Sequence, residues 1–190
     1  MEEVYHIDKE FKNITYTDNV ISEREFVNCV FQNCTLAKLT FEDCYFENCR
    51  FEDSDLTMVN VKGSSFRDVT FEGCKMLGIL WDEAATPVMV NFEECVLSFS
   101  NFWGLSLKKI KIEKCIVKEV NFSETNLSEA SFKNSDLESS IFVNTNLSKA
   151  NFEGAFNYFF NVNTNKVKGA LFSMPEVVSL LTGLGIKIKL

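Results

Sequence analysis

An apolar residue stands at every fifth position over most of this chain, and that period constrains its fold more than any other feature. An α-helix returns to one face about every 3.6 residues and a flat strand every second residue, so neither groups residues five apart. A chain that turns a corner after each five residues does group them. The first run of central residues is Phe11, Tyr16, Ile21, Phe26, Phe31, Leu36, Phe41, Phe46, Phe51, Leu56, Val61, Phe66, Phe71, Met76 and Trp81. The second run is Phe92, Leu97, Phe102, Leu107, Ile112, Val117, Phe122, Leu127, Phe132, Leu137, Phe142, Leu147, Phe152, Val162, Val167 and Phe172, interrupted by the polar Asn157.

A second period of twenty residues lies within the first. Phe residues stand twenty apart at Phe11, Phe31, Phe51 and Phe71. The series resumes one residue late at Phe92, Ile112, Phe132, Phe152 and Phe172. Twenty residues make four sides of five, so the sequence predicts an all-β fold, a right-handed quadrilateral β-helix of about eight coils. Coils that pair like strands lie about 4.8 Å apart, which gives a rod about 40 Å long.

The seven cysteines support this arrangement, because each of them precedes a central residue by two positions. They are Cys29, Cys34, Cys44, Cys49, Cys74, Cys95 and Cys115. This position is otherwise mostly small or β-branched, so Cys fits it as a small buried apolar residue. The spacing matches no standard zinc motif and no histidine is near, which argues against a metal site. A disulfide between stacked neighbours, such as Cys29 and Cys49, is the alternative, and the odd count leaves one thiol over.

The repeat resembles a known family. The segment from Val120 to Leu137 reads VNFSETNLSEASFKNSDL, and Asn146 to Gly154 reads NLSKANFEG. Both resemble the pentapeptide-repeat consensus A-(D/N)-(L/F)-x-x, and the resemblance extends over residues 11–172. The family's fold is the four-sided β-helix already predicted from the spacing.

Within this family the chain is most similar to Qnr-type quinolone-resistance proteins and to microcin immunity proteins. The similar features are its length, its division into two registers, and the tail VSLLTGLGI from Val178 to Ile186. The resemblance implies a homodimer joined at the C-terminal ends. It also implies a rod that imitates duplex DNA and interacts with DNA gyrase or topoisomerase IV, conferring fluoroquinolone resistance or toxin immunity. A structural or protein-interaction scaffold with a different partner is the alternative.

The chain departs from those proteins in its loops and its charge. Phe26 to Trp81 runs without interruption, so the first projecting loop of Gram-negative Qnr proteins is absent. Residues 1–77 hold 15 Asp and Glu against 8 Lys and Arg, whereas residues 78–190 hold 12 against 11. A dimer joined at its C-terminal ends would therefore have acidic tips and a nearly neutral centre. A local basic patch is expected from Lys108, Lys109, Lys111, Lys114 and Lys118.

Three regions are expected along the chain. Residues 1–10 are predicted to cap the N-terminal end, and residues 11–172 to form the β-helix, with a register break near residues 82–91. The break contains Pro87, which cannot donate a ladder hydrogen bond. It is interpreted as a one-residue register correction, with a partner-contact loop as the alternative. Trp81 just before it is in register, so it is expected in the core.

Residues 173–190 lose the repeat. Pro175 predicts a helix start, Gly183 and Gly185 predict its end, and alternation at Ile186 to Leu190 predicts a half-buried strand. This tail either caps the last coil or pairs with a second chain, because an open coil exposes strand edges and an apolar cross-section. The residues expected at a dimer interface are Val177, Val178, Leu180, Leu181, Leu184, Ile186 and Ile188.

The sequence argues against an enzyme and predicts no cofactor or metal. His6 is the only histidine, so no His-based triad can form in the core, and no phosphate-binding or dinucleotide motif occurs. The net charge of −8 argues against direct nucleic-acid binding. No apolar run is long enough for a membrane span, and the N-terminus lacks a signal-peptide pattern, so a cytoplasmic protein is expected. The residues expected to contact a partner are the acidic Glu47, Glu52, Asp53, Asp55, Asp82 and Glu83.

Overall fold

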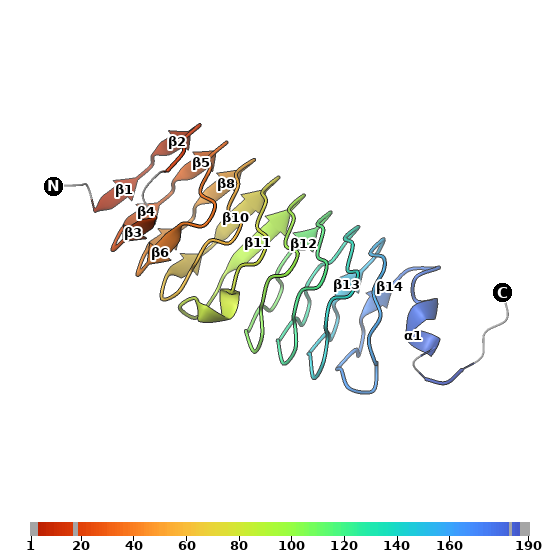
Figure 1. Cartoon of the computed structure of the whole chain (residues 1–190). Helices are drawn as coiled ribbons and strands as arrows, with labels where there is room; N and C mark the ends of the chain where they lie inside the picture. Colours follow the sequence, from red (N-terminus) through yellow and green to blue (C-terminus); the bar gives the residue numbers. More distant parts are fainter. Residues whose placement is uncertain (1–3, 17–18, 183, 187–190) are drawn as a thin grey trace.

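The computed structural model describes residues 4–16, 19–182 and 184–186. The chain winds into a rod of stacked coils with the described N-terminal residues at one end and a short helix at the other (Figure 1). All pairing between coils is parallel, and residues twenty or twenty-one apart lie side by side. The predicted all-β, right-handed quadrilateral β-helix is therefore confirmed. None of the described helices has the length and apolar composition that a membrane crossing requires.

Each coil has four faces, numbered here in the order in which the chain passes through them. Face 1 holds β2 (Glu10–Lys12), β5 (Val30–Gln32), β8 (Arg50–Glu52), β10 (Val69–Glu72), β11 (Val90–Glu93), β12 (Ile112–Glu113), β13 (Asn151–Phe152) and β14 (Leu171–Phe172). Face 2 consists of isolated bridges from Thr15 to Phe156. Face 3 holds β3 (Val20–Ser22) and β6 (Thr40–Glu42). Face 4 holds β1 (Tyr5–Ile7), β4 (Glu25–Val27), β7 (Tyr45–Glu47) and β9 (Ser65–Arg67).

The pairing register changes by one residue in the fourth coil. Phe51 pairs with Phe71 twenty residues on, whereas Phe71 pairs with Phe92 twenty-one residues on. The extra residue is accommodated between the 3-10 turn η1 (Trp81–Glu83) and β11, on face 4. Trp81, the central residue of face 3 in this coil, is 1% exposed, as expected of a core residue.

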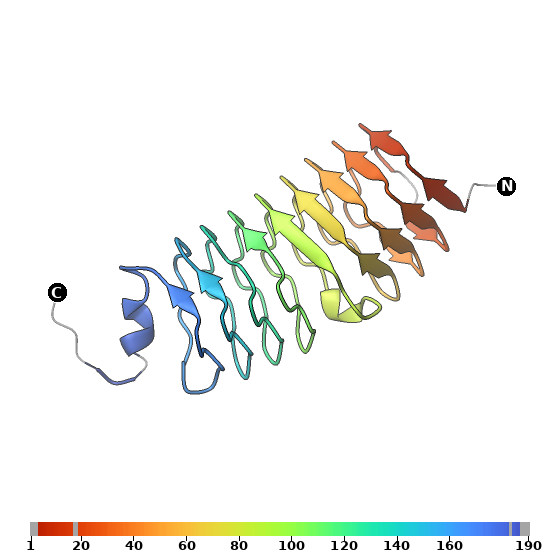
Figure 2. The same cartoon turned by 180° about the vertical axis from the view of Figure 1, so that it is seen from behind.

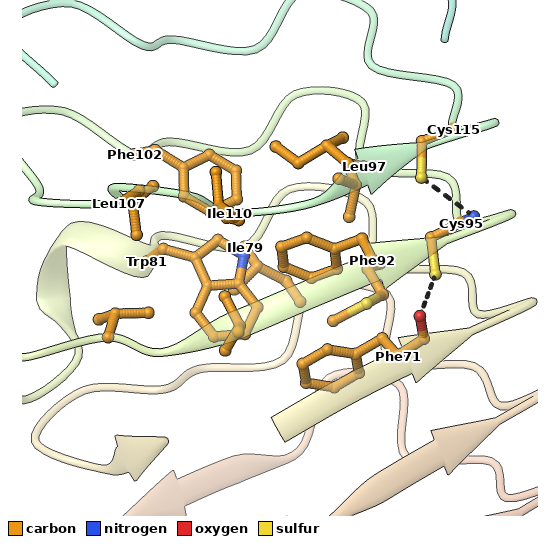
Figure 3. Close-up of a cluster of buried hydrophobic side chains, with 14 of the residues drawn as sticks. Phe71, Ile79, Trp81, Phe92, Cys95, Leu97, Phe102, Leu107, Ile110 and Cys115 are labelled. Carbon is orange, nitrogen blue, oxygen red and sulfur yellow. Dashed lines mark hydrogen bonds between the residues drawn. The ribbon is translucent and has the colours of Figure 1, made fainter. Parts of the chain in front are cut away.

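Columns of rings fill the core. Consecutive Phe rings on face 1 stack with centroids 4.5 to 5.3 Å apart, and rings from faces 3 and 4 meet them edge-on. At the register change, the Trp81 ring stands edge-on to Phe71 and Phe92 and stacks over Phe102 (Figure 3). Offset and edge-on ring pairs are favourable beyond the area they bury, so the columns explain why the sequence repeats Phe so often.

Most described corners have a left-handed backbone. The residue two after the central one then has φ between +47° and +74°, and it is mostly Asn, Asp, Glu, Lys or Gly. Short polar side chains and glycine accept this conformation most easily. A Cβ on Gly154 would overlap the Oδ1 atom of Asn134 in the coil before it, whereas Gly104 has nothing within 4 Å of such a position.

Most Asn and Asp residues directly before a central residue close the turns. Asn121 Oδ1 accepts a hydrogen bond from the Ser123 backbone N–H at 3.0 Å. The same bond recurs at Asp55, Asn60, Asn126, Asp136, Asn146 and Asn151. Asn91 differs, since it lies in β11 and accepts from the Lys111 N–H across the ladder. These side chains are therefore occupied in holding turns.

The ends of the repeat differ from the regular spacing in two ways. Residues 5–10 do not form a separate cap, because β1 and the start of β2 already pair with β4 and β5 as part of the first coil. His6 takes the inward place and stacks on Phe26 with ring centroids 4.8 Å apart. Near the other end, Asn157 points outward and Tyr158 fills the core in its place.

The tail begins its helix later than the sequence predicts. Turns occupy residues 174–177, and the helix α1 runs over Val178–Thr182. The strand predicted from Ile186 to Leu190 falls almost entirely on residues 187–190, which lie outside the described residues.

Candidate interaction surfaces

Four carboxylates form an in-register ladder along face 1. Glu72 pairs with Glu52 on one side and with Glu93 on the other, and Glu93 pairs with Glu113. The ladder arises because the residue after the central Phe or Ile is Glu in four successive coils. Successive carboxylates are about 4.8 Å apart at the backbone. Like charges at this distance destabilise the fold. Packing therefore gives no reason for four Glu residues in one line.

Basic side chains compensate only part of the ladder. Arg50 pairs with Glu52, and Lys114 Nζ lies 2.9 Å from Glu93 Oε1 and 3.0 Å from Glu94 Oε1. The hydrogen bonds that Lys114 donates to the carboxylates of Glu93 and Glu94 raise the pKa of Lys114, which stays charged. Among the described residues Glu72 has no ion pair or side-chain hydrogen bond. The middle of face 1 is therefore left with uncompensated negative charge.

The acidic residues predicted to contact a partner do not form one surface. Four of them belong to one coil but to different sides of it. Glu47 lies on face 4, Glu52 on face 1, Asp53 at the corner between faces 1 and 2, and Asp55 on face 2. Asp55 Oδ1 also accepts the Thr57 N–H at 2.9 Å, which makes it a turn residue. Only Glu52 belongs to the carboxylate ladder.

The other two predicted contact residues lie on the far side of the rod. Asp82 and Glu83 belong to η1, which follows face 3. Asp82 is half-buried and Glu83 is exposed. Glu72, Glu93 and Glu113 were not predicted as contact residues. The signal for them is in the sequence, because successive Glu residues from Glu52 to Glu113 are twenty or twenty-one positions apart.

The expected patch of five lysines is split by the corners of the coil. Lys108 and Lys109 lie on face 4, Lys111 and Lys114 on face 1, and Lys118 on face 2. Lysines close in sequence point in different directions because each corner turns the chain by about a quarter of a circle. The predicted patch is therefore wrong.

A charged network occupies face 2. The nearly buried Asp136 accepts from Asn157 Nδ2 at 2.8 Å, and its Oδ2 lies 3.0 Å from Lys118 Nζ. Burial on its own raises the pKa of Asp136, but the hydrogen bonds from Asn157 and Lys118 outweigh it and hold the pKa below its usual range. This network explains the polar residue at position 157. The Asn157 side chain donates a hydrogen bond to the nearly buried carboxylate of Asp136, which lowers the free-energy cost of burying it.

The tail closes the C-terminal end of the rod with part of its apolar surface. Leu180 is 3% exposed and packs inside its own chain, and the half-buried Val177 contacts the same core. Ser179 Oγ donates to the Tyr158 backbone carbonyl at 2.8 Å. Burial of Tyr158, with the nearby Glu176, raises its pKa to about 12. The inner side of α1 is thus a cap on the last coil.

The outer side of the tail is apolar and open. Leu181, Leu184 and Ile186 are 37%, 41% and 51% exposed, and Val178 is half-buried. Ile188, also expected at the interface, lies outside the described residues. Further exposed apolar side chains at this end are Phe159, Leu171 and Met174. Several exposed large apolar side chains at one end of a rod are typical of a protein contact.

A second exposed apolar group lies along the corner between faces 2 and 3. Met58 and Phe99 stand at left-handed corner positions, with φ of 56° and 66°, where the other coils place polar residues or glycine. Leu80 and Trp103 are also exposed, on face 3, which follows this corner. These four residues are called the apolar corner. The apolar corner is separate from the carboxylate ladder, which lies on face 1.

The N-terminal end of the rod is hollow. Its cavity has a volume of about 350 Å³ and is lined by Phe11, Ile14, Ile21, Phe26 and Phe31 together with His6 and Arg24. Residues 1–3 and 17–18 lie outside the described residues.

The cysteines are buried and free, as their inward spacing predicts. Cys49 Sγ donates to the Phe26 carbonyl at 3.3 Å, and burial raises the pKa of this thiol to about 12. Cys95 Sγ donates to the Phe71 carbonyl, and the Cys95 N–H donates to Cys115 Sγ (Figure 3). Within the described part of the chain, His, Cys, Asp and Glu side chains nowhere gather in threes that suit a metal ion. The thiols are therefore structural.

The comparisons with known proteins agree with this fold. The model of the pentapeptide repeat region matches residues 24–102, and the model of pentapeptide repeats in eight copies matches residues 115–155. The chain belongs to the pentapeptide-repeat family. No curated protein sequence is matched.

Two solved structures show the same fold at low identity. QnrB1, a plasmid-mediated fluoroquinolone resistance protein, is 18% identical over 97% of this chain and 99% of its own, with a TM-score of 0.53. HetL from Nostoc sp. strain PCC 7120, involved in heterocyst differentiation regulation, is 14% identical over 88% of this chain and 84% of its own, with a TM-score of 0.55. These likenesses concern the fold alone.

Proposed function

We propose that this protein is a non-enzymatic, cytoplasmic binding protein whose carboxylate ladder on face 1 occupies a DNA-binding surface of a partner protein. DNA gyrase and topoisomerase IV are the partners that the resemblance to Qnr-type proteins suggests, with fluoroquinolone resistance or toxin immunity as the outcome. The ladder carries the proposal, since Glu52, Glu72, Glu93 and Glu113 follow one straight line on a rod.

The charge density sets the strength expected of such binding. Duplex DNA carries one charge per about 1.7 Å of its axis. The ladder carries one per about 4.8 Å, and the corner carboxylates of Asp53 and Glu94 add to it. The rod is thus a sparser polyanion than DNA, and its binding should weaken steeply as salt rises.

Gyrase supercoiling with ciprofloxacin tests the proposal. Purified protein should restore supercoiling or inhibit it directly. The variant Glu72→Gln/Glu93→Gln should lose the effect, while Glu119→Gln/Glu124→Gln, which removes two charges away from face 1, should keep it. Absence of any effect with either enzyme, or equal loss in both variants, contradicts the proposal.

The exposed apolar C-terminal end supports association of two copies there, as expected from the tail. Replacement of Leu184 and Ile186 by Asp should shift the mass in light scattering from dimer to monomer. An unchanged mass argues against this interface. The variant should fold normally, because both side chains are exposed.

A scaffold for a different partner is the second candidate, and the apolar corner favours it. A DNA-like surface needs no exposed Phe99 or Trp103, whereas aromatic and Met side chains are enriched in protein interfaces. A partner captured by the native protein, rebuilt from purified components and lost with Phe99→Ser/Trp103→Ser but not with Glu72→Gln/Glu93→Gln would support this candidate over the first.

A further inference from the structure

The first coil of the rod has an open edge. β1, β2 and β3 lie at the N-terminal end, and no described helix or strand lies beyond them (Figure 1 and Figure 2). β2 is the outermost strand of the face 1 sheet, and β1 is the outermost strand of the face 4 sheet. An open strand edge presents unpaired backbone donors and acceptors, so it is a site at which another chain can pair.

The backbone groups on this edge of β2 belong to two residues. The Lys9 carbonyl and the Asn13 N–H are both bonded to the second coil, at 2.9 Å each. Alternate residues of a strand direct their backbone groups to opposite sides, so the odd-numbered residues of β2 face the second coil. Glu10 and Lys12 therefore direct their N–H and C=O groups toward the open end of the rod.

The same alternation holds on the two adjoining faces. On face 4, the Val4 carbonyl and the Asp8 N–H bond to the second coil at 2.9 and 3.0 Å, so the backbone of Ile7 faces the open end. On face 2, the Ile14 carbonyl accepts from the second coil at 2.8 Å, so the backbone of Thr15 faces the open end.

The side chains of β2 carry opposite charges at its two ends. Glu10 and Lys12 flank Phe11, and both are exposed. Lys12 Nζ lies 2.7 Å from Glu10 Oε2, and the hydrogen bond from Lys12 lowers the pKa of Glu10, so the two side chains are charged together. In an antiparallel pair of two such strands, the first residue of each lies opposite the last residue of the other. The edge is therefore complementary to itself in charge.

We propose that the N-terminal end of the rod binds the N-terminal end of a second copy, with β2 paired antiparallel to β2 of that copy. The two-fold axis is perpendicular to the face 1 sheet and passes between the two Phe11 residues. Residues at equal distances before and after Phe11 then lie opposite each other. Glu10 lies opposite Lys12 of the second copy, and each directs its N–H and C=O groups toward the other, as in a hydrogen-bonded antiparallel pair.

The adjoining faces fit the same axis. It exchanges faces 2 and 4, so β1 of one copy lies beside residues 14–16 of the other. Ile7 and Thr15 are equally far from Phe11, and they lie opposite each other with their backbone groups directed at the other copy. A steady rise of the coil keeps this spacing, since β1 is a quarter of a coil above β2 and residues 14–16 are a quarter of a coil below it. Three faces therefore pair at once, with about eight backbone hydrogen bonds, and face 3 stays unpaired.

The second copy also covers the apolar end of the core. The cavity of about 350 Å³ opens there, Phe11 is half-buried, and Ile14 and Tyr16 are each 36% exposed. In the dimer the two Phe11 rings are neighbours in one column, and His6 lies opposite Tyr16 of the second copy. Burial of these side chains favours association. A single extended peptide would pair with one face and leave the core open, so a second copy is the occupant that fits this end.

Charge selects the register of the pairing. A slip by two residues in one direction places Lys12 opposite Lys12, and a slip in the other direction places Glu10 opposite Glu10, which destabilises both alternatives. The contact is small. Sides of five residues at about 3.3 Å, with their outer side chains, give an end about 20 Å across, or about 800 Å² buried in total. This area predicts a weak, reversible dimer.

Sedimentation equilibrium at about 0.1 mM protein tests the proposal in the background Leu184→Asp/Ile186→Asp. This background removes association through the tail, because contacts at both ends would link the rods into open chains. It should dimerise reversibly. Glu10→Lys and Lys12→Glu should each weaken the dimer by about tenfold, since each brings like charges together twice by symmetry. The combined variant Glu10→Lys/Lys12→Glu should restore it.

Arg50→Glu is the matched control. Arg50 occupies the column of Glu10 two coils further in and pairs with Glu52 in the same way, so the change in charge equals that of Lys12→Glu. It should leave the dimer unchanged. The contact uses neither the tail nor the carboxylate ladder, so it does not depend on the proposed function.

Amide hydrogen exchange by NMR provides a second measurement. The Lys12 N–H should exchange more slowly in the background than in its Glu10→Lys variant at the same concentration. The Asn13 N–H, which is bonded within the chain, should be protected in both. A monomeric background, no restoration by the combined variant, or equal exchange of the Lys12 N–H in both proteins overturns the proposal.

Discussion

The ring column on face 1 should be the main source of stability, and Phe132→Ala tests it. The Phe132 side chain is fully buried, and its ring stacks on Phe152 at 5.1 Å and meets Phe122 edge-on at 5.7 Å. Replacing a buried Phe by Ala costs about 3–5 kcal/mol, from lost transfer energy and the cavity left behind. A third ring contact, edge-on to Phe142 at 6.1 Å, is lost as well, which places this site near the upper end, at about 4 kcal/mol.

Phe11→Ala is the matched comparison. Phe11 belongs to the same column and stacks on Phe31 at 4.8 Å, but it is only half-buried in the first coil. Its loss should cost about half as much, about 2 kcal/mol, because part of the ring is already exposed to water. Phe132→Ile should cost only about 1 kcal/mol, since Ile112 occupies the same column one coil earlier.

Urea unfolding followed by circular dichroism measures these differences from the midpoints. The slope of the transition must stay constant, because a change in slope would show that part of the rod unfolds separately. Equal costs for Phe132→Ala and Phe11→Ala would refute a continuous stacked core.

Three further predictions concern the surface network, the thiols and the corners. Asp136→Asn should lower the free energy of unfolding at pH 7. The difference in stability from the native protein should shrink below about pH 4, because a carboxyl with a lowered pKa stabilises the fold only while it is charged. Urea unfolding measured at several pH values checks this. Cys49 should not react with a thiol reagent at pH 8 until urea is added, because burial raises its pKa to about 12. Gly154→Ala should lower the free energy of unfolding more than Gly104→Ala does, by about 1 kcal/mol or more, and so give the lower melting temperature, since both strain the backbone but only Gly154 faces a side chain. Equal melting temperatures would contradict the last prediction.

The residues that point into the core were largely predictable from the sequence. The central Phe residues and the seven cysteines are buried as the period of five requires. The series of central residues shifts by one position between Phe71 and Phe92, and these two residues pair directly in the structure. Burial decides these positions residue by residue, so a repeating pattern is enough to identify them.

The exceptions inside the core have local causes. His6 was left out of the repeat because histidine is not counted as apolar, yet its ring stacks like a Phe. Asn157 occupies a central position in sequence, but its bond to Asp136 turns it outward and lets Tyr158 replace it. Neither effect is visible without the neighbouring coil.

The grouping of outward-pointing residues into surfaces was decided by the tertiary structure. Lys108 and Lys118 are ten residues apart in sequence and lie on different faces, whereas Glu52 and Glu113 are far apart and lie in one line. The tail likewise divides between the buried Leu180 and the exposed Leu181 only once α1 meets the last coil. Apolar burial selects the inward residues one at a time, so the sequence alone reveals the solenoid. A shared surface depends on which coils and corners lie side by side, and only the closed fold determines that.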